Sequence, residues 1–169
     1  YYDEPGRGTL ARDGGGVLLT QAIHTLDLFL SLTPPLAEVT AFAATSALHV
    51  METEDSVAAA LRFDGGALGA LDATTAAYPG FPERIDLAGT KATAVLTPGR
   101  LELYHQDGRR ESIGEEAAGG GGADPMAFTH DAHRGVLVEF LDALDGGRAP
   151  VNSGRAALRV HYLIEALLE

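Results

Sequence analysis

Apolar residues recur at spacings of three and four along residues 17–32, and this pattern predicts a helix with one buried face. Three polar residues, Thr20, His24 and Asp27, stand at i, i+4 and i+7, so we expect them to share a second, polar face. A Thr-Pro-Pro sequence then ends the segment, because proline cannot continue a helix. The apolar positions expected to be buried are Leu19, Ile23, Leu26 and Leu30.

The middle of the chain alternates apolar residues with small or polar ones, as β-strands do. Turn residues divide this region, most clearly the hairpin signal Asp64-Gly65-Gly66. The strands predicted between these turns cover Leu36–His49, Asp55–Phe63, Ala67–Thr75, Arg84–Ala88, Ala92–Thr97 and Arg100–Tyr104.

Two helical patterns close the chain, over Met126–Leu144 and Ser153–Leu168. A glycine-rich segment, Ala117–Pro125, precedes them and is expected to be a mobile loop. The apolar positions expected on their buried faces are Val136, Phe140, Leu141 and Leu144 in the first helix and Ala157, Val160, Ile164 and Leu167 in the second. The order of helix, strands and helices predicts an α+β fold, an open, mainly antiparallel sheet with helices on one face.

The other face of this sheet is expected to carry unusually small residues, which would let a second copy approach closely. These residues are Ala41, Ala43, Thr45, Ala58, Ala60, Gly69, Ala73 and Thr75. One interpretation is a homo-oligomer that forms through this sheet face. The alternative is that the alanines only reflect a compositional bias.

Length, charge and the absence of cysteine narrow the functional classes. The 169 residues suffice for one domain over residues 1–169, and 46% hydrophobic with 21% charged residues is typical of a globular chain. The net charge is −12, from 24 acidic and 12 basic residues, so binding to nucleic acid or to an anionic membrane is not expected. Without cysteine there is no disulfide and no thiolate site.

Two further features of the sequence concern membranes and processing. The apolar stretches look much shorter than the roughly 20 residues that cross a bilayer, and no signal peptide follows Tyr1, so we expect a cytoplasmic protein. Because the chain does not begin with Met, we expect a fragment or a processed form of a longer protein.

The candidate site lies where three glycines meet the first helix. Glycines at positions 14–16 let the backbone approach another group closely, since no Cβ stands in the way. His24 follows on the polar stripe, and an imidazole suits proton transfer near neutral pH. The alternatives are a histidine that is part of the core and a glycine loop that simply turns into the helix.

Several other features carry weaker hypotheses. His130 and His133, with Asp131, form an H-D-x-H cluster without a third well-placed protein ligand, so we predict polar surface at a helix start or lining of a substrate cleft, and no metal site. An acidic stretch with Glu52, Glu54 and Asp55 is interpreted as a solvated strand entrance. The aromatic loop around Tyr78 either borders a substrate site or covers a strand connection, and Arg7 is a candidate contact to an anionic substrate.

The order and spacing of several short motifs point to one family. They are Tyr1-Tyr2, Arg7-Gly8-Thr9, Asp13-Gly14-Gly15-Gly16, Gln21-Ala22-Ile23-His24 with Asp27, Glu54-Asp55-Ser56, Phe63-Asp64-Gly65-Gly66-Ala67, Ile85–Thr90, Phe140–Pro150 and Arg155–Glu165. With these motifs the chain resembles, over nearly its whole length, the C-terminal domain of the Gfo/Idh/MocA-like oxidoreductases, the superfamily of glucose–fructose oxidoreductase and inositol dehydrogenase.

This resemblance implies an NAD(P)-dependent oxidoreductase that acts on a sugar or polyol, with a Rossmann domain before residue 1. NAD or NADP would be bound mainly by that domain, because Leu19 occupies the third glycine position of a G-x-G-x-x-G fingerprint. The family's Glu-Lys-Pro motif is also missing, since the one lysine is Lys91. The chain by itself is therefore expected to be inactive.

The resemblance also assigns roles to residues around the helix. His24 matches the family's usual proton-transfer residue, Thr20 stands where many members have an aspartate, and Asp27 would orient the imidazole ring or bind substrate. The further residues implied are Gln21, Arg7 and Tyr78 on the substrate side and, weakly, Gly15 and Gly16 on the nicotinamide side. The alternative is a ligand-sensing or regulatory relative that has lost catalysis, which the threonine favours.

Overall fold

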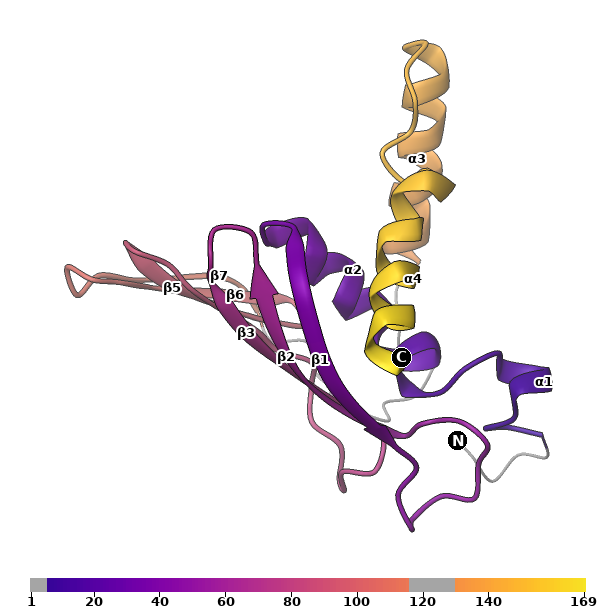
Figure 1. Cartoon of the computed structure of the whole chain (residues 1–169). Helices are drawn as coiled ribbons and strands as arrows, with labels where there is room; N and C mark the ends of the chain where they lie inside the picture. The colour runs from indigo at the N-terminus through magenta and orange to yellow at the C-terminus, as the bar shows by residue number, and fades with distance from the viewer. Residues whose placement is uncertain (1–5, 116–129) are drawn as a thin grey trace. The chain divides into compact units, whose positions relative to one another are not determined.

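The computed structural model describes residues 6–115 and 130–169. It divides into two compact units, one made of Tyr1–Ala76 with Thr129–Glu169 and the other of Ala77–Phe128. Each unit is described by itself, with the labels of Figure 1.

The first unit combines a three-stranded sheet with helices from both ends of the chain. The strands pair antiparallel in the order β1-β2-β3. Figure 1 shows α2 and α4 packed together beside this sheet, and α4 also contacts β1. The elements are α1 (Leu10–Asp13), the π-helical turn η1 (Leu18–Ala22), α2 (Ile23–Leu32), β1 (Leu36–Ala44), β2 (Ser56–Phe63), β3 (Leu68–Thr74), α3 (Asp131–Asp145) and α4 (Gly154–Leu168).

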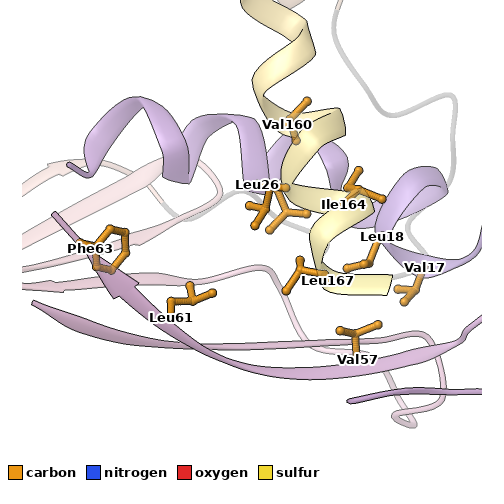
Figure 2. Packing of buried hydrophobic residues seen from close by; sticks show 10 residues of the cluster. Val17, Leu18, Leu26, Val57, Leu61, Phe63, Val160, Ile164 and Leu167 are labelled. Atoms are coloured by element: carbon orange, nitrogen blue, oxygen red, sulfur yellow. The ribbon is translucent and has the colours of Figure 1, made fainter. Parts of the chain in front are cut away.

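The core lies between the sheet and the helices. Alternate residues of β2, Val57, Leu61 and Phe63, are buried, as the period of two in a strand requires. Figure 2 shows Val57 and Leu61 facing the helices across the core. The buried helical residues that meet them are Val17, Leu18, Leu26, Val160, Leu163, Ile164 and Leu167.

The strand register shows which residues share the uncovered face of the sheet. Directly opposed residues of antiparallel strands point to the same side. Buried Val57 pairs with Ala43 and Ala73, so these two alanines lie on the side of the core. The expectation that all the small residues share the uncovered face is therefore wrong. We call the side of the sheet that points away from the core the open face, and its residues are Glu38, Thr40, Phe42, Ala44, Ser56, Ala58, Ala60, Arg62, Leu68, Ala70, Asp72 and Thr74.

The second unit is a four-stranded antiparallel sheet in the order β4-β5-β6-β7. Its strands are β4 (Ile85–Ala88), β5 (Ala92–Thr97), β6 (Arg100–His105) and β7 (Arg110–Gly114). β7 was not predicted, because Ile113 is its one large apolar residue. The antiparallel α+β fold is confirmed, but the strands pair in two sheets where one sheet was expected.

The three long helices are confirmed, with two changes in their apolar faces. In α4 the buried stripe includes Leu163, whereas Ala157 is exposed. In α3 the predicted buried residues are all more than half exposed, from 51% for Val136 to 66% for Leu144, because no described element covers them. The short helix α1 was not predicted, and the predicted glycine loop at Ala117–Pro125 falls outside the described residues.

One segment, Leu10–Leu32, is apolar and long enough to cross a membrane, with a mean hydropathy of 1.3 over an 18-residue window. This corrects the expectation that every apolar stretch in the chain falls far short of that length. Such a segment is weak evidence for a membrane span, since core helices pass the same test. Here Leu18 and Leu26 of this segment are buried in the core against β2 and α4.

Candidate functional site

The start of the first long helix is held by Glu54. The backbone N–H of Val17 donates to the carbonyl oxygen of Glu54 at 2.8 Å, and that of Leu18 donates to Oε1 of the same residue at 3.1 Å. The first N–H groups of a helix have no partners within the helix, and they favour a negative charge nearby. One residue from a distant loop therefore supplies both acceptors and the charge.

Gly16 makes this contact possible. It is buried, and a Cβ atom at this position would overlap the carbonyl oxygen and the carboxylate of Glu54. At Gly15 a Cβ atom would instead crowd the side chain of Leu19, at 3.0 Å. The glycines thus allow the start of the helix to pack closely against the loop that precedes β2.

The loop that carries Glu54 is itself pinned by Asp55. The Asp55 side chain is buried, and it accepts hydrogen bonds from the Ser46 N–H at 2.8 Å, from the Ser46 hydroxyl at 2.6 Å and from Nδ1 of His49 at 2.8 Å. Burial raises the pKa of Asp55, but the hydrogen bonds, above all those from Ser46, outweigh it and hold the pKa below its ordinary value.

The interpretation of this acidic stretch as a solvated strand entrance is wrong. Besides the contacts of Glu54 and Asp55, Oε2 of Glu52 accepts the N–H of Leu10 at 3.0 Å. All three carboxylates thus accept backbone N–H groups, and those of Glu52 and Glu54 do so at the beginning of helices α1 and η1. Sequence reasoning missed this role of Glu54. The available signal was that the helix begins Gly-Val-Leu, without the Ser, Thr, Asp or Asn that usually caps a helix.

The helix presents its polar residues outward. Gln21, His24 and Asp27 are exposed, so His24 is not a core histidine. Thr20 is half-buried, and its hydroxyl donates to the carbonyl oxygen of Gly16 at 2.8 Å. The π-helical turn over Leu18–Ala22 rotates less per residue than an α-helix, so Thr20 and His24 do not keep the α-helical relation that the sequence predicts.

Neither predicted neighbour holds the imidazole. Among residues 6–115 and 130–169, no hydrogen bond or ion pair is made by the side chain of His24, and Asp27 does not bond to it. Within the described part of the chain, therefore, neither ring nitrogen of His24 is engaged.

Two further predicted substrate residues, Arg7 and Tyr78, are not on this helix. Arg7 pairs with Asp13, with Nη1 3.1 Å from Oδ1, and the N–H of Gly8 donates to the other carboxylate oxygen at 2.7 Å. Tyr78 is 96% exposed and belongs to the second unit. The structure thus brings together Thr20, Gln21, His24 and Asp27 on one helix, with Gly15 and Gly16 at its start. Arg7 is engaged with Asp13, which directly precedes the glycine run.

The histidines near α3 do not form a metal centre with other described residues. His130 precedes the helix and His133 lies on it, exposed. In the part of the chain that the structure describes, no group of three or more His, Asp or Glu side chains is arranged to hold a metal ion.

Comparison with known proteins adds the family. Residues 2–95 match the sequence model of the GFO/IDH/MocA C-terminal domain. The chain belongs to the GFO/IDH/MocA family. A comparison with curated proteins found no match.

Solved structures of similar fold support this assignment. The WlbA dehydrogenase from Bordetella pertussis, in complex with NADH and UDP-GlcNAcA, is 26% identical, with a TM-score of 0.74 over 99% of this chain and 49% of that chain. UDP-N-acetylglucosamine 3-dehydrogenase GnnA from Acidithiobacillus ferrooxidans is 24% identical, with a TM-score of 0.67 over 90% of this chain and 45% of that one.

A third similar structure is levoglucosan dehydrogenase in complex with NADH, which is 20% identical, with a TM-score of 0.72 over 92% of this chain and 48% of that one. At 24% and 20% identity, GnnA and levoglucosan dehydrogenase show the fold alone. This chain of the GFO/IDH/MocA family spans about half the length of these neighbours.

Proposed function

We propose that residues 1–169 act as the substrate-binding and oligomerisation domain of an NAD(P)-dependent oxidoreductase, which oxidises a sugar or polyol by hydride transfer. The family match supports this proposal, as does the likeness to a dehydrogenase in complex with NADH and a sugar nucleotide. The observation that carries it is the exposed, unengaged imidazole of His24 on a helix whose start is fixed in the core.

The dinucleotide would be held mainly by another part of the protein. Gly16 is closed off by Glu54, whose carboxylate would repel a pyrophosphate, so the glycine run of this chain is not a phosphate loop. When NAD or NADP is bound, its oxidised nicotinamide ring supplies the hydride acceptor. A contact of Gly15 with the nicotinamide stays a proposal, whereas Gly16 is buried against Glu54.

His24 would accept the hydroxyl proton of the substrate. As a carbinol becomes a carbonyl, the C–H bond gives up a hydride and the O–H bond gives up a proton, and a base within hydrogen-bond reach removes that proton. In the reverse direction the protonated imidazole returns it. An exposed imidazole suits both directions, because histidine changes charge in the physiological pH range.

The neighbours of His24 would bind substrate hydroxyls. The Thr20 hydroxyl already donates to Gly16, so toward a ligand it can act only as an acceptor. Gln21 can donate and accept, and Asp27 can accept. Arg7 and Tyr78 stay proposals as further substrate contacts.

The oligomer would form through the open face. Phe42 is 82% exposed and Leu68 is 76% exposed, with alanines between them on β2. On this face Asp72 opposes Ala58 and Arg62 opposes Leu68, so charged residues border the apolar ones. Exposed apolar residues with a polar rim are typical of an interaction site. Small side chains at its centre would let the sheets of two copies pack closely.

The test uses the full-length protein with NAD⁺ or NADP⁺ and a panel of UDP-sugars, free sugars and polyols. We expect saturable reduction of the nicotinamide with at least one member of the panel, and no reduction by residues 1–169 alone. If the full-length protein binds a sugar ligand but neither binds nor reduces a dinucleotide, the protein is a ligand sensor and the oxidoreductase proposal is wrong.

A further inference from the structure

We propose that Glu54 is a positioning residue for the reaction, and that it sets where the imidazole of His24 stands by holding the start of its helix. This inference rests on the proposed role of His24 as the proton acceptor.

The contact with Glu54 fixes both the position of the helix along its axis and its rotation about that axis. Val17 and Leu18 donate their N–H groups to two different oxygens of Glu54, at 2.8 and 3.1 Å. The side chains of Val17 and Leu18 are buried in the core. The helix therefore cannot slide along its axis without breaking these bonds, and it cannot rotate without pulling two side chains from the core.

The backbone next to Glu54 is held firmly by the sheet. The next residue, Asp55, donates its N–H to the Ala44 carbonyl at 3.1 Å and accepts the Thr75 N–H at 3.0 Å, so the sheet holds it from both neighbouring strands. Its buried carboxylate adds the bonds from Ser46 and His49. The sheet thereby fixes the position of Glu54, and the hydrogen bonds to Glu54 fix the start of the helix.

His24 follows Leu18 by six residues, across the π-helical turn η1 and into the start of α2. A shift at the helix start is carried to His24 as a rigid displacement. A misplacement of about 1 Å in a reacting group can lower a rate about 100-fold. The start of the helix is therefore a place where a residue without substrate contact can control turnover.

Two substitutions in the full-length protein separate the effect of the length of the Glu54 side chain from the effect of its charge. Glu54→Asp keeps the charge, but its shorter side chain draws the carboxylate away from the Leu18 N–H. Glu54→Gln loses the charge and keeps an oxygen at the same reach. The matched control is Glu52→Asp, which shortens a neighbouring carboxylate that accepts the N–H of Leu10 at the start of α1.

We expect E54D to lower kcat about 10- to 100-fold with KM changed by less than about threefold, since substrate contacts remain. E54Q and E52D should each keep kcat within about threefold of the unchanged protein. Thermal unfolding of each variant shows that the rates refer to folded protein.

The inference is overturned if folded E54D turns over at the unchanged rate, or if E54Q loses as much kcat as E54D. A His24→Ala variant measured alongside keeps the two proposals apart. Full turnover in H24A would remove the proposed role of His24, whereas loss of turnover in H24A with an unchanged E54D would remove only the role of Glu54.

Discussion

The carboxylate of Asp55 lies 2.8 Å from Nδ1 of His49, and the Asp55 side chain is 0% exposed. Ser46 adds two further hydrogen bonds to the same carboxylate. This cluster fastens both ends of the connection between β1 and β2, and that connection also carries the glutamates that hold α1 and η1.

Replacing Asp55 should therefore weaken the whole unit. We expect Asp55→Asn to lower the free energy of unfolding by about 2–3 kcal/mol, because buried donors lose a charged acceptor. Urea unfolding of the variant at neutral pH measures this loss. Asp64→Asn, at an exposed turn, is the control and should change stability little.

The sign of the pH dependence follows from the same cluster. The pKa of Asp55 in the folded protein is lower than its ordinary value of 3.8. Its contribution to stability is therefore present above that value and is lost as the pH falls below it. Unfolding of D55N should show a smaller loss of stability on acidification than the unchanged protein, and an equal loss would contradict this account.

The two glycine positions Gly16 and Gly135 should respond oppositely to alanine. A Cβ at Gly16 overlaps Glu54, so we expect Gly16→Ala to destabilise the protein by about 1–3 kcal/mol. Gly135 lies within α3 with open space around a Cβ, so Gly135→Ala should stabilise by up to about 1 kcal/mol. Thermal unfolding of the two variants checks both signs, and a harmless G16A would contradict the close packing.

Much of the fold could be predicted because its signals are local. The spacing of Leu26 and Leu30 gave the first helix, and turn residues such as Gly65 and Gly66 gave the strand boundaries. The face of the sheet could not be predicted, because the run Ala58-Ala59-Ala60 carries no contrast between apolar and polar positions. Which side is buried depends on how β2 pairs with its neighbours.

The candidate site was predictable only in part. His24 and its polar neighbours follow from helical spacing, but Glu54 stands 36 residues from the N–H group that it accepts. No local pattern links the two, since the contact depends on the tertiary fold. For the same reason the sequence predicted an apolar stripe on α3, around Phe140, without indicating what covers it.

Glu139 gives a second acid-sensitive contact, between α3 and the turn before α4. Hydrogen bonds from Arg148 and then from the Val151 N–H lower the pKa of Glu139 from 4.5 to about 2. Its stabilising effect is therefore present above pH 4.5 and is lost between that pH and about pH 2.

The variant Glu139→Gln should accordingly lose less thermal stability than the unchanged protein over this pH range. The control is Glu165→Gln, at an exposed position of α4, which should follow the unchanged protein. If E139Q and E165Q show the same acid dependence, the contact with Arg148 contributes nothing.

The open face makes a separate prediction about assembly. We expect Ala60→Arg to lower the oligomeric mass of the full-length protein, because a long charged side chain at the centre of the face keeps two sheets apart. Light scattering after size-exclusion chromatography measures the mass. Ala157→Arg, on the exposed side of α4, is the matched control, and an unchanged mass in A60R would place the oligomer contact elsewhere.

The most direct test of the central claim compares His24→Ala with His161→Ala in the full-length protein. Both histidines are exposed on helices, but only His24 is assigned to the reaction. We expect H24A to lower kcat about 10²- to 10⁴-fold while NADH binding is kept, and H161A to stay within about twofold. Turnover of H24A close to that of H161A would contradict the assignment of His24 as the proton acceptor.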